Sequence, residues 1–175
     1  MTTANKLTIV RVVLIPVFLI VLYWGFPGAR WAALAIFIIA SLTDTLDGYI
    51  ARHCNQVTDF GKFMDPLADK MLVMAAMCYF AESGAMRGWV LAVVLMREFA
   101  VSGMRLVAVE QGRVIAAAKS GKIKTASTMV CICLMLVFNS AVLGAVCQAV
   151  ILATTVYSGA EYFIKNRDVF RGSAA

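Results

Sequence analysis

Residues 125–160 read TASTMVCICLMLVFNSAVLGAVCQAVILATTVYSGA, a run of 36 residues without a charged side chain. A membrane-spanning helix needs about 20 apolar residues and can be slightly shorter, so the run is long enough for two passes. Asn139, Ser140 and Gly144 lie near its middle and are residues typical of a turn. The stretch therefore predicts two antiparallel membrane helices joined by a short turn.

The composition extends this prediction to the whole chain. Of the 175 residues, 62% are hydrophobic and only 15% are charged. Six passes of about 20 residues would use about 120 residues, which fits that apolar content. Disordered, fibrous and disulfide-rich secreted proteins are excluded, and the five cysteines form no CxxC pair. No polar stretch reaches the roughly 50 residues of a separate soluble domain. We therefore expect one integral membrane domain over residues 1–175.

Four more apolar segments precede the opening run. They cover residues 12–29, 31–50, 59–81 and 88–107, and the first ends in the breaker Gly25-Phe26-Pro27-Gly28. Pro66 is expected to kink the third segment. The sequence thus predicts an all-α protein with six transmembrane helices and both termini on one side of the membrane. The first segment is expected to be retained as a helix rather than cleaved.

The basic residues predict the orientation of these helices. Thirteen of the sixteen Lys and Arg residues fall on one face, Arg30 and Arg87 on the other, and Arg97 within a span. Because Lys and Arg accumulate in cytoplasmic loops, both termini and the two longest loops are expected on the cytoplasmic side of the membrane. The membrane itself is expected to be a bacterial inner membrane. The net charge of +6 then favours anionic membrane lipids over nucleic acid as a partner.

A second stretch, DTLDGYIARHCNQVTDFGKFMDPLADK at residues 44–70, places four aspartates at the ends of two spans. Asp44 and Asp47 are three apart, and Asp65 and Asp69 are four apart, so each pair shares one helix face. Carboxylates this close would repel one another without cations. All-oxygen donors favour Mg²⁺ or Mn²⁺, and two divalent ions sharing ligands would fit four aspartates.

Neighbouring residues suggest that this site also takes a phosphate group. Gly48 and Gly61 lack a Cβ, so a bulky phosphate or a base could approach the backbone. Arg52 follows Asp44 by eight positions, on the same helix face, and offers a planar donor fork for a diphosphate.

The stretch fits D-x2-D-G-x2-A-R-x8-G-x3-D-x3-D at all eight fixed positions and resembles the CDP-alcohol phosphatidyltransferase family. Within this family, the chain most resembles the phosphatidylglycerophosphate synthase branch. The segments that carry this resemblance are NKLTIVR at 5–11, DPLADK at 65–70, REFAVSGMR at 97–105 and GKIKT at 121–125. The resemblance implies a six-helix fold, usually homodimeric, around a polar cavity that opens to the cytoplasm and receives CDP-diacylglycerol.

The resemblance also implies roles for individual residues. Asp44, Asp47 and Asp65 would bind one metal, Asp44, Asp65 and Asp69 the second, and Asp69 would act as general base. A hydroxyl of glycerol 3-phosphate would attack the β-phosphorus, and CMP would leave. The residues expected to contact CDP-diacylglycerol are Asn5, Thr8, Gly48, Arg52, Thr58 and Gly61.

The anionic acceptor is expected to meet a basic cluster. Its members are Arg97, Arg105, Lys119, Lys122 and Lys124. Lysines at the mouth of the fifth helix, Lys122 above all, are expected to turn into the cavity; the alternative is that the cluster only anchors the chain to anionic lipid headgroups. Arg97 either lines the phosphate pocket or forms a structural ion pair. Glu161 is the favoured structural partner, because the adjacent Glu98 does not face it on a helix.

Three alternatives stay open. A sibling enzyme could use inositol phosphate, serine or a second phosphatidylglycerol as acceptor. A small cation transporter could use the same aspartates, but would expect acidic residues near the midplane or on both sides. A non-catalytic assembly protein would leave the cost of four intramembrane carboxylates unexplained.

Overall fold

The structure is a computed structural model that describes residues 3–53, 59–112, 115 and 118–167. Within these ranges, side chains are described except at residues 3–8, 44–53, 59–66 and 69.

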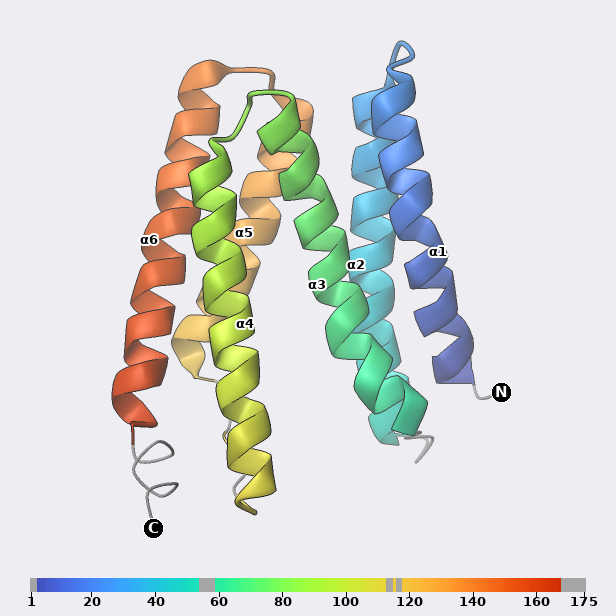
Figure 1. Cartoon of the computed structure of the whole chain (residues 1–175). Coiled ribbons are helices and arrows are strands. Elements are labelled where there is room, and N and C mark those ends of the chain that lie inside the picture. The colour runs from blue at the N-terminus through green and yellow to red at the C-terminus, as the bar shows by residue number, and fades with distance from the viewer. Residues whose placement is uncertain (1–2, 54–58, 113–114, 116–117, 168–175) are drawn as a thin grey trace. The chain divides into compact units, whose positions relative to one another are not determined.

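The described residues form six α-helices and no strand, which confirms the expected all-helical class (Figure 1). The helices are α1 (Thr3–Trp24), α2 (Ala29–His53), α3 (Asp59–Glu82), α4 (Gly88–Glu110), α5 (Lys119–Val137) and α6 (Ala141–Lys165).

The turns between helices follow local chemistry. Gly25 and Gly28 have φ values of 65° and 93°, a left-handed region that glycine adopts without strain, and they end α1 at Trp24. Ser140 caps α6, because its side chain accepts a hydrogen bond from the amide of Leu143. The turn predicted over residues 139–144 is therefore shorter than expected, and Gly144 lies inside α6. Helix α3 continues through Pro66.

Within the residues that the structure describes, two helices are long and apolar enough to cross a membrane, namely α5 and α6. They correspond to the uncharged run at residues 125–160. Shorter apolar helical segments cover Ile9–Trp24 and Ala29–Thr43.

The chain divides into two compact units. The first contains α1, α2, most of α3 and the last residues of α5, and the second contains α4, α6 and most of α5. Within each unit, successive helices run in opposite directions (Figure 1).

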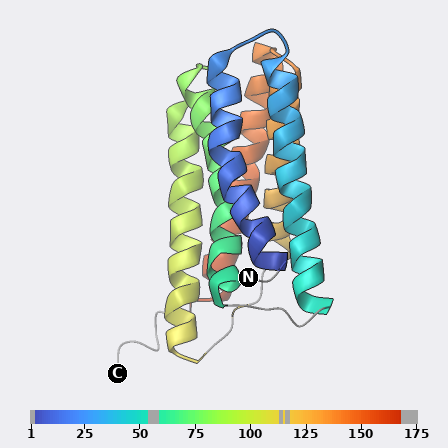
Figure 2. The same cartoon turned by 90° about the vertical axis from the view of Figure 1, so that its right-hand side faces the viewer.

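In the first unit, α1 and α2 form an antiparallel pair that lies side by side in both views (Figure 1 and Figure 2). Ile15, Phe18 and Leu22 are buried on α1, and Phe18 contacts Phe37 of α2 with ring centroids 6.0 Å apart. Ala33 and Ala40 are fully buried on α2, where small side chains permit close helix packing.

In the second unit, α4 packs against α6. The buried residues of α4 are Val90, Val94, Val101, Met104 and Ala108, and those of α6 include Ile151, Thr155, Ser158 and Tyr162. Both sets recur at steps of three, four or seven, as one face of a helix requires. Position 97 falls on the same face of α4, so the chain places an arginine within its packed stripe.

Candidate active site

The spacing of buried residues along α2 leads to the first pair of aspartates. Its buried residues Ala33, Phe37 and Ala40 recur at steps of three or four, and the same steps lead to positions 44 and 47. Asp44 and Asp47 therefore continue the line of the packed stripe, at the end of α2 away from the Gly28 turn. Their side chains lie outside the described residues.

The spacing of buried residues along α3 leads to the second pair of aspartates in the same way. Leu72, Ala76 and Phe80 are buried at steps of four, and the steps back along the helix reach positions 69 and 65. Asp65 and Asp69 are thus in line with the packed stripe of α3, near its first turns. Both pairs belong to the first unit. The side chains of Asp65 and Asp69 also lie outside the described residues.

For the other residues expected to bind the donor, the structure describes either the backbone alone or nothing. Asn5 and Thr8 lie in the first turns of α1, Gly48 and Arg52 in α2, and Gly61 in the first turn of α3. Thr58 lies outside the described residues. Among the side chains that the structure does describe, no group of three or more His, Cys, Asp or Glu could hold a metal ion. The four aspartates lie outside that set.

A basic residue that the sequence analysis assigned to the cytoplasmic face is buried. Arg11 has 1% of its surface exposed and precedes Ile15, Phe18 and Leu22 on the packed stripe of α1. The spacing of four to Ile15 is the signal that could have predicted this. A buried cation costs free energy unless an anion compensates it, so Arg11 places positive charge inside the same unit that carries the aspartates.

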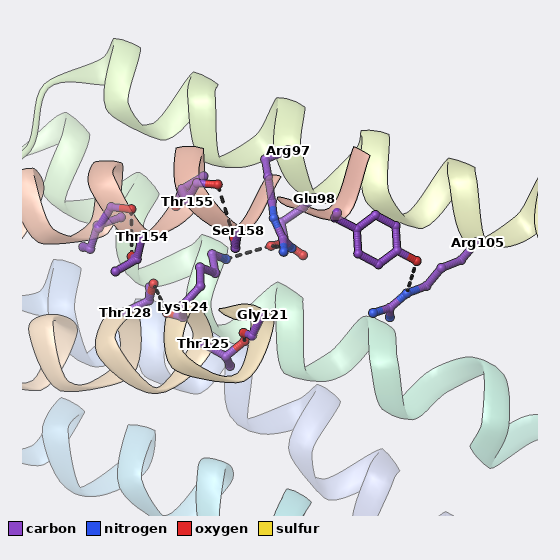
Figure 3. Close-up of polar contacts among 12 residues, drawn as sticks. Arg97, Glu98, Arg105, Gly121, Lys124, Thr125, Thr128, Thr154, Thr155 and Ser158 are labelled. Atoms are coloured by element: carbon purple, nitrogen blue, oxygen red, sulfur yellow. Dashed lines mark hydrogen bonds and ion pairs between the residues drawn. The ribbon is translucent and has the colours of Figure 1, made fainter. Parts of the chain in front are cut away.

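In the second unit, one carboxylate joins two cations (Figure 3). Glu98 Oε1 accepts a hydrogen bond from Arg97 Nη1 at 3.0 Å and from Lys124 Nζ at 2.7 Å. The three side chains are only 6–14% exposed. Because two positive charges share one negative charge, the network carries a net charge of +1 in a largely buried position. Such a site favours an additional anion.

The ion-pair partner of Arg97 differs from the one that the sequence analysis favoured. The structure pairs Arg97 with the adjacent Glu98, whereas Glu161 pairs with Lys165 one turn further along α6. The rule that neighbouring positions do not face each other describes where Cβ atoms point. The long side chain of an arginine can fold back along the helix and reach its neighbour, and here it does so.

Two glycines make room for Arg97. A Cβ built on Gly159 of α6 would lie 3.2 Å from Arg97 Cγ, and one on Gly121 of α5 would lie 3.7 Å from Arg97 Nη2. The arginine side chain therefore lies between α5 and α6, and a larger residue at position 159 would crowd it, whereas a Cβ at position 121 would make an ordinary contact. Arg97 Nε is buried without a hydrogen-bond partner among the described residues, so the network retains an unused donor.

The lysines of α5 lie on different faces of the helix. Ser120, Lys124, Thr128 and Cys131 are buried at steps of three or four, which puts Lys124 on the inward face. Lys122 lies two positions away and is exposed, as is Lys119. Lys124, rather than Lys122, is therefore the lysine that turns inward. The Thr128 hydroxyl donates to the Lys124 carbonyl at 2.8 Å and is satisfied within α5.

Arg105 is a further cation of α4 and lies closer to the C-terminal end of this helix, apart from the Arg97–Glu98–Lys124 network (Figure 3). Its Nε donates to the Tyr162 hydroxyl at 3.1 Å, and its guanidinium carbon lies 5.5 Å from the centre of that ring. Tyr162 is 2% exposed and packs with Val101, Met104 and Ala108. The sequence analysis did not identify Tyr162 as the residue that holds Arg105. Its step of four from Ser158 on the inward face of α6 is the signal that could have done so.

The chain matches the family model for CDP-alcohol phosphatidyltransferase over residues 1–157. A protein of Bacillus subtilis (strain 168) named CDP-diacylglycerol--glycerol-3-phosphate 3-phosphatidyltransferase is 41% identical to it over 187 residues, which cover 97% of each chain. A protein of Escherichia coli (strain K12) with the same name is 41% identical over 74% of each chain. A probable phosphatidylglycerophosphate synthase of Mycobacterium tuberculosis (strain CDC 1551 / Oshkosh) is 39% identical over 91% of this chain and 78% of its own.

The six helices, the aspartates in register on α2 and α3, and these similarities define the class of protein. The chain belongs to the CDP-alcohol phosphatidyltransferase family. The three relatives named above all bear names of its glycerol 3-phosphate or phosphatidylglycerophosphate branch.

Proposed function

We propose that this protein transfers the phosphatidyl group of CDP-diacylglycerol to sn-glycerol 3-phosphate, giving phosphatidylglycerophosphate and CMP in phospholipid biosynthesis. The observation that carries the proposal is the 41% identity, over 97% of both chains, to a relative named for that reaction. The eight fixed positions of the family pattern between residues 44 and 69 support the same donor.

The four aspartates fit two divalent ions, Mg²⁺ or Mn²⁺. The donor set consists of carboxylates at matching register on α2 and α3, and hard oxygen donors are what these ions prefer. When bound, the ions would neutralise negative charge on the diphosphate oxygens. Asp44, Asp47 and Asp65 would hold one of them, and Asp44, Asp65 and Asp69 the other.

The chain's own residues would perform the remaining steps. Arg52 would orient the diphosphate through its planar guanidinium, while Gly48 and Gly61 would let the nucleotide approach the backbone. Asp69 would take the proton from the acceptor hydroxyl. The hydroxyl oxygen then forms a bond to the β-phosphorus, and the bond from that phosphorus to the oxygen of CMP breaks. An aspartate is a weak base, so its contribution would depend on position.

The acceptor phosphate would be bound by largely buried cations of α4 and α5. The Arg97–Glu98–Lys124 network has one positive charge in excess, and it lies where water is largely excluded. Electrostatic interactions are stronger in such surroundings than on an open surface. Arg105, Lys119 and Lys122 are exposed nearby in sequence and would attract the phosphate dianion toward the network.

The membrane arrangement that accompanies this function has six spans, with both termini and the active site in the cytoplasm. Helices of 19 to 25 residues are long enough to cross the hydrocarbon core. The thirteen-to-two distribution of basic residues supports the orientation. The family resemblance adds a homodimer, which cross-linking in native membranes would detect.

One assay tests the reaction. Purified protein receives CDP-diacylglycerol and Mg²⁺ with glycerol 3-phosphate, inositol phosphate, serine or phosphatidylglycerol, and CMP release is measured. We expect release with glycerol 3-phosphate alone, and its loss when EDTA removes the metal. Release with a different alcohol but not with glycerol 3-phosphate would overturn the acceptor assignment. Release that persists in EDTA would overturn the metal assignment.

A further inference from the structure

A cavity of about 230 Å³ lies on the second unit, between α4 and α6. It is at the end of these helices that carries the turn before α4 and the turn between α5 and α6. Arg105 lies toward the opposite end of α4, and the lysines of the basic cluster lie at the end of α5 away from its turn to α6, so the cavity is separate from these members of the cluster. Its polar lining comes from Arg87, Trp89 and Gln148.

The segment that carries Arg87 is fixed in place by Gln148. The Gln148 side-chain oxygen accepts from the backbone amide of Arg87 at 2.9 Å, and its amide nitrogen donates to the Ala85 carbonyl at 3.1 Å. A Cβ on Gly144 would lie 3.4 Å from the same carbonyl, so this glycine lets the segment approach α6 closely. The backbone at Ala85 and Arg87 is therefore hydrogen-bonded to α6, and the Arg87 side chain lines the cavity.

The charge of the cavity favours an anion. Within the described part of the chain, Arg87 forms no ion pair, and none of the residues that line the cavity is acidic. The guanidinium therefore has an unshared positive charge and several free donors beside a concave surface. A phosphate group matches the donor fork of a guanidinium and can accept two parallel hydrogen bonds from it.

The rest of the lining is apolar. Val90, Ala149 and Leu152 continue the cavity from Arg87 along the two helices. Trp89 is 52% exposed beside them, and tryptophan is enriched at the boundary between headgroups and hydrocarbon. A free phosphate ion would gain nothing from this apolar surface, whereas the upper part of an acyl chain would bury it.

From this combination we propose that the cavity is a binding site for an anionic phospholipid. The lipid phosphodiester pairs with Arg87, and the start of an acyl chain lies against Val90, Ala149 and Leu152. A zwitterionic lipid would bind less well, because its amine finds no carboxylate in the lining. The site is at the turn end of α4 and α6, where phospholipid headgroups meet the protein if these helices span the membrane.

Native mass spectrometry of protein released from nanodiscs tests the proposal. The discs contain either phosphatidylcholine alone or phosphatidylcholine with phosphatidylglycerol, and the number of retained lipids is counted. We expect the native chain to retain one phosphatidylglycerol that Arg87→Gln loses. Leu152→Trp should lose it as well, because the indole fills the apolar part of the cavity. Arg30→Gln, which removes the other arginine assigned to this face, is the matched control and should retain it.

The possible outcomes distinguish a specific lipid-binding site from nonspecific contact with membrane lipids. Equal retention by the native chain and Arg87→Gln would overturn the proposal, and so would equal retention of phosphatidylcholine. Displacement of the lipid by millimolar inorganic phosphate would show that the site takes a free anion instead. CMP release by Arg87→Gln reports whether the variant is folded, because this residue is not part of the proposed reaction.

Discussion

At the scale of single residues, Glu98 has the most consequential position among the described side chains. One of its oxygens accepts hydrogen bonds from two cations, so it compensates charge that would otherwise be buried alone. The sequence located Arg97 within a span but favoured Glu161 as its partner. The error came from using Cβ directions for a side chain long enough to fold back on its own helix.

We expect Glu98→Gln to lower the stability of the folded protein. Breaking a fully buried ion pair costs about 3–5 kcal/mol. Because the side chains here keep 6–14% exposure, about 2 kcal/mol is expected, or roughly a 4–8 °C decrease in Tm. Thermal unfolding in detergent measures it. Glu161→Gln is the control, since its partner Lys165 is 65% exposed and such solvent-exposed pairs contribute little to stability. Equal Tm changes in the two variants would show that Glu98 is not the central anion.

Lys124 and Lys122 form a matched pair two positions apart on one helix. Lys124→Gln removes a cation from the buried network, so we expect the KM for glycerol 3-phosphate to rise at least tenfold. Lys122→Gln removes an exposed cation, and a rise of about two- to threefold is expected from weaker long-range attraction. Steady-state CMP release gives both values. A larger effect of Lys122 would mean that the acceptor binds outside the Glu98 network.

For the proposed general base, Asp69→Asn should retain the donor and lose turnover. The amide keeps the shape of the side chain but cannot accept the proton from the acceptor hydroxyl, and general base catalysis contributes about 10²–10⁴-fold. Binding of CDP-diacylglycerol is measured by retention on the purified protein, and kcat by CMP release. A variant with near-normal kcat would exclude the base role. A variant that no longer binds the donor would show that Asp69 acts through the metal site.

At the scale of helices, the spacing of residues determines which polar groups face inward. Steps of three or four on α2, α3, α4 and α5 place Asp44, Asp65, Arg97 and Lys124 in line with buried apolar residues. The sequence predicted the helices, because these follow from local periodicity, whereas the site formed by the aspartates stays a prediction. The sequence did not predict the burial of Arg11 or the contact of Arg105 with Tyr162, because these depend on which helices become neighbours.

The packing of α6 beside Arg97 is tested by Gly159→Val. A Cβ here would already lie 3.2 Å from Arg97 Cγ, and the two further methyl groups of valine would displace the arginine from Glu98. We expect a lower Tm and at least a tenfold loss in kcat/KM for glycerol 3-phosphate. Ala160→Val is the control, because this next position on α6 is exposed. If Ala160→Val lowers Tm and kcat/KM as much as Gly159→Val does, the effect does not come from the space that the glycine leaves for Arg97.

At the scale of the whole molecule, charge asymmetry carries the most information. Sixteen basic residues among 175 are few, yet thirteen fall on one predicted face. The structure tests length and composition, and α5 and α6 meet the criteria for membrane helices. Orientation is a property of the chain in a bilayer, so it follows from the distribution of charge and requires a measurement in membranes.

Single cysteines introduced into a chain whose five native cysteines are replaced by serine measure the orientation. Ala85→Cys lies in the turn before α4, and Gln111→Cys lies just after that helix. If α4 spans the membrane with its basic end inside, a membrane-impermeant maleimide should label position 85 in intact spheroplasts and position 111 only after lysis. The reverse pattern would move the basic cluster to the outside, where a soluble cytoplasmic acceptor could not reach it, and labelling of both positions before lysis would show that α4 does not separate the two sides.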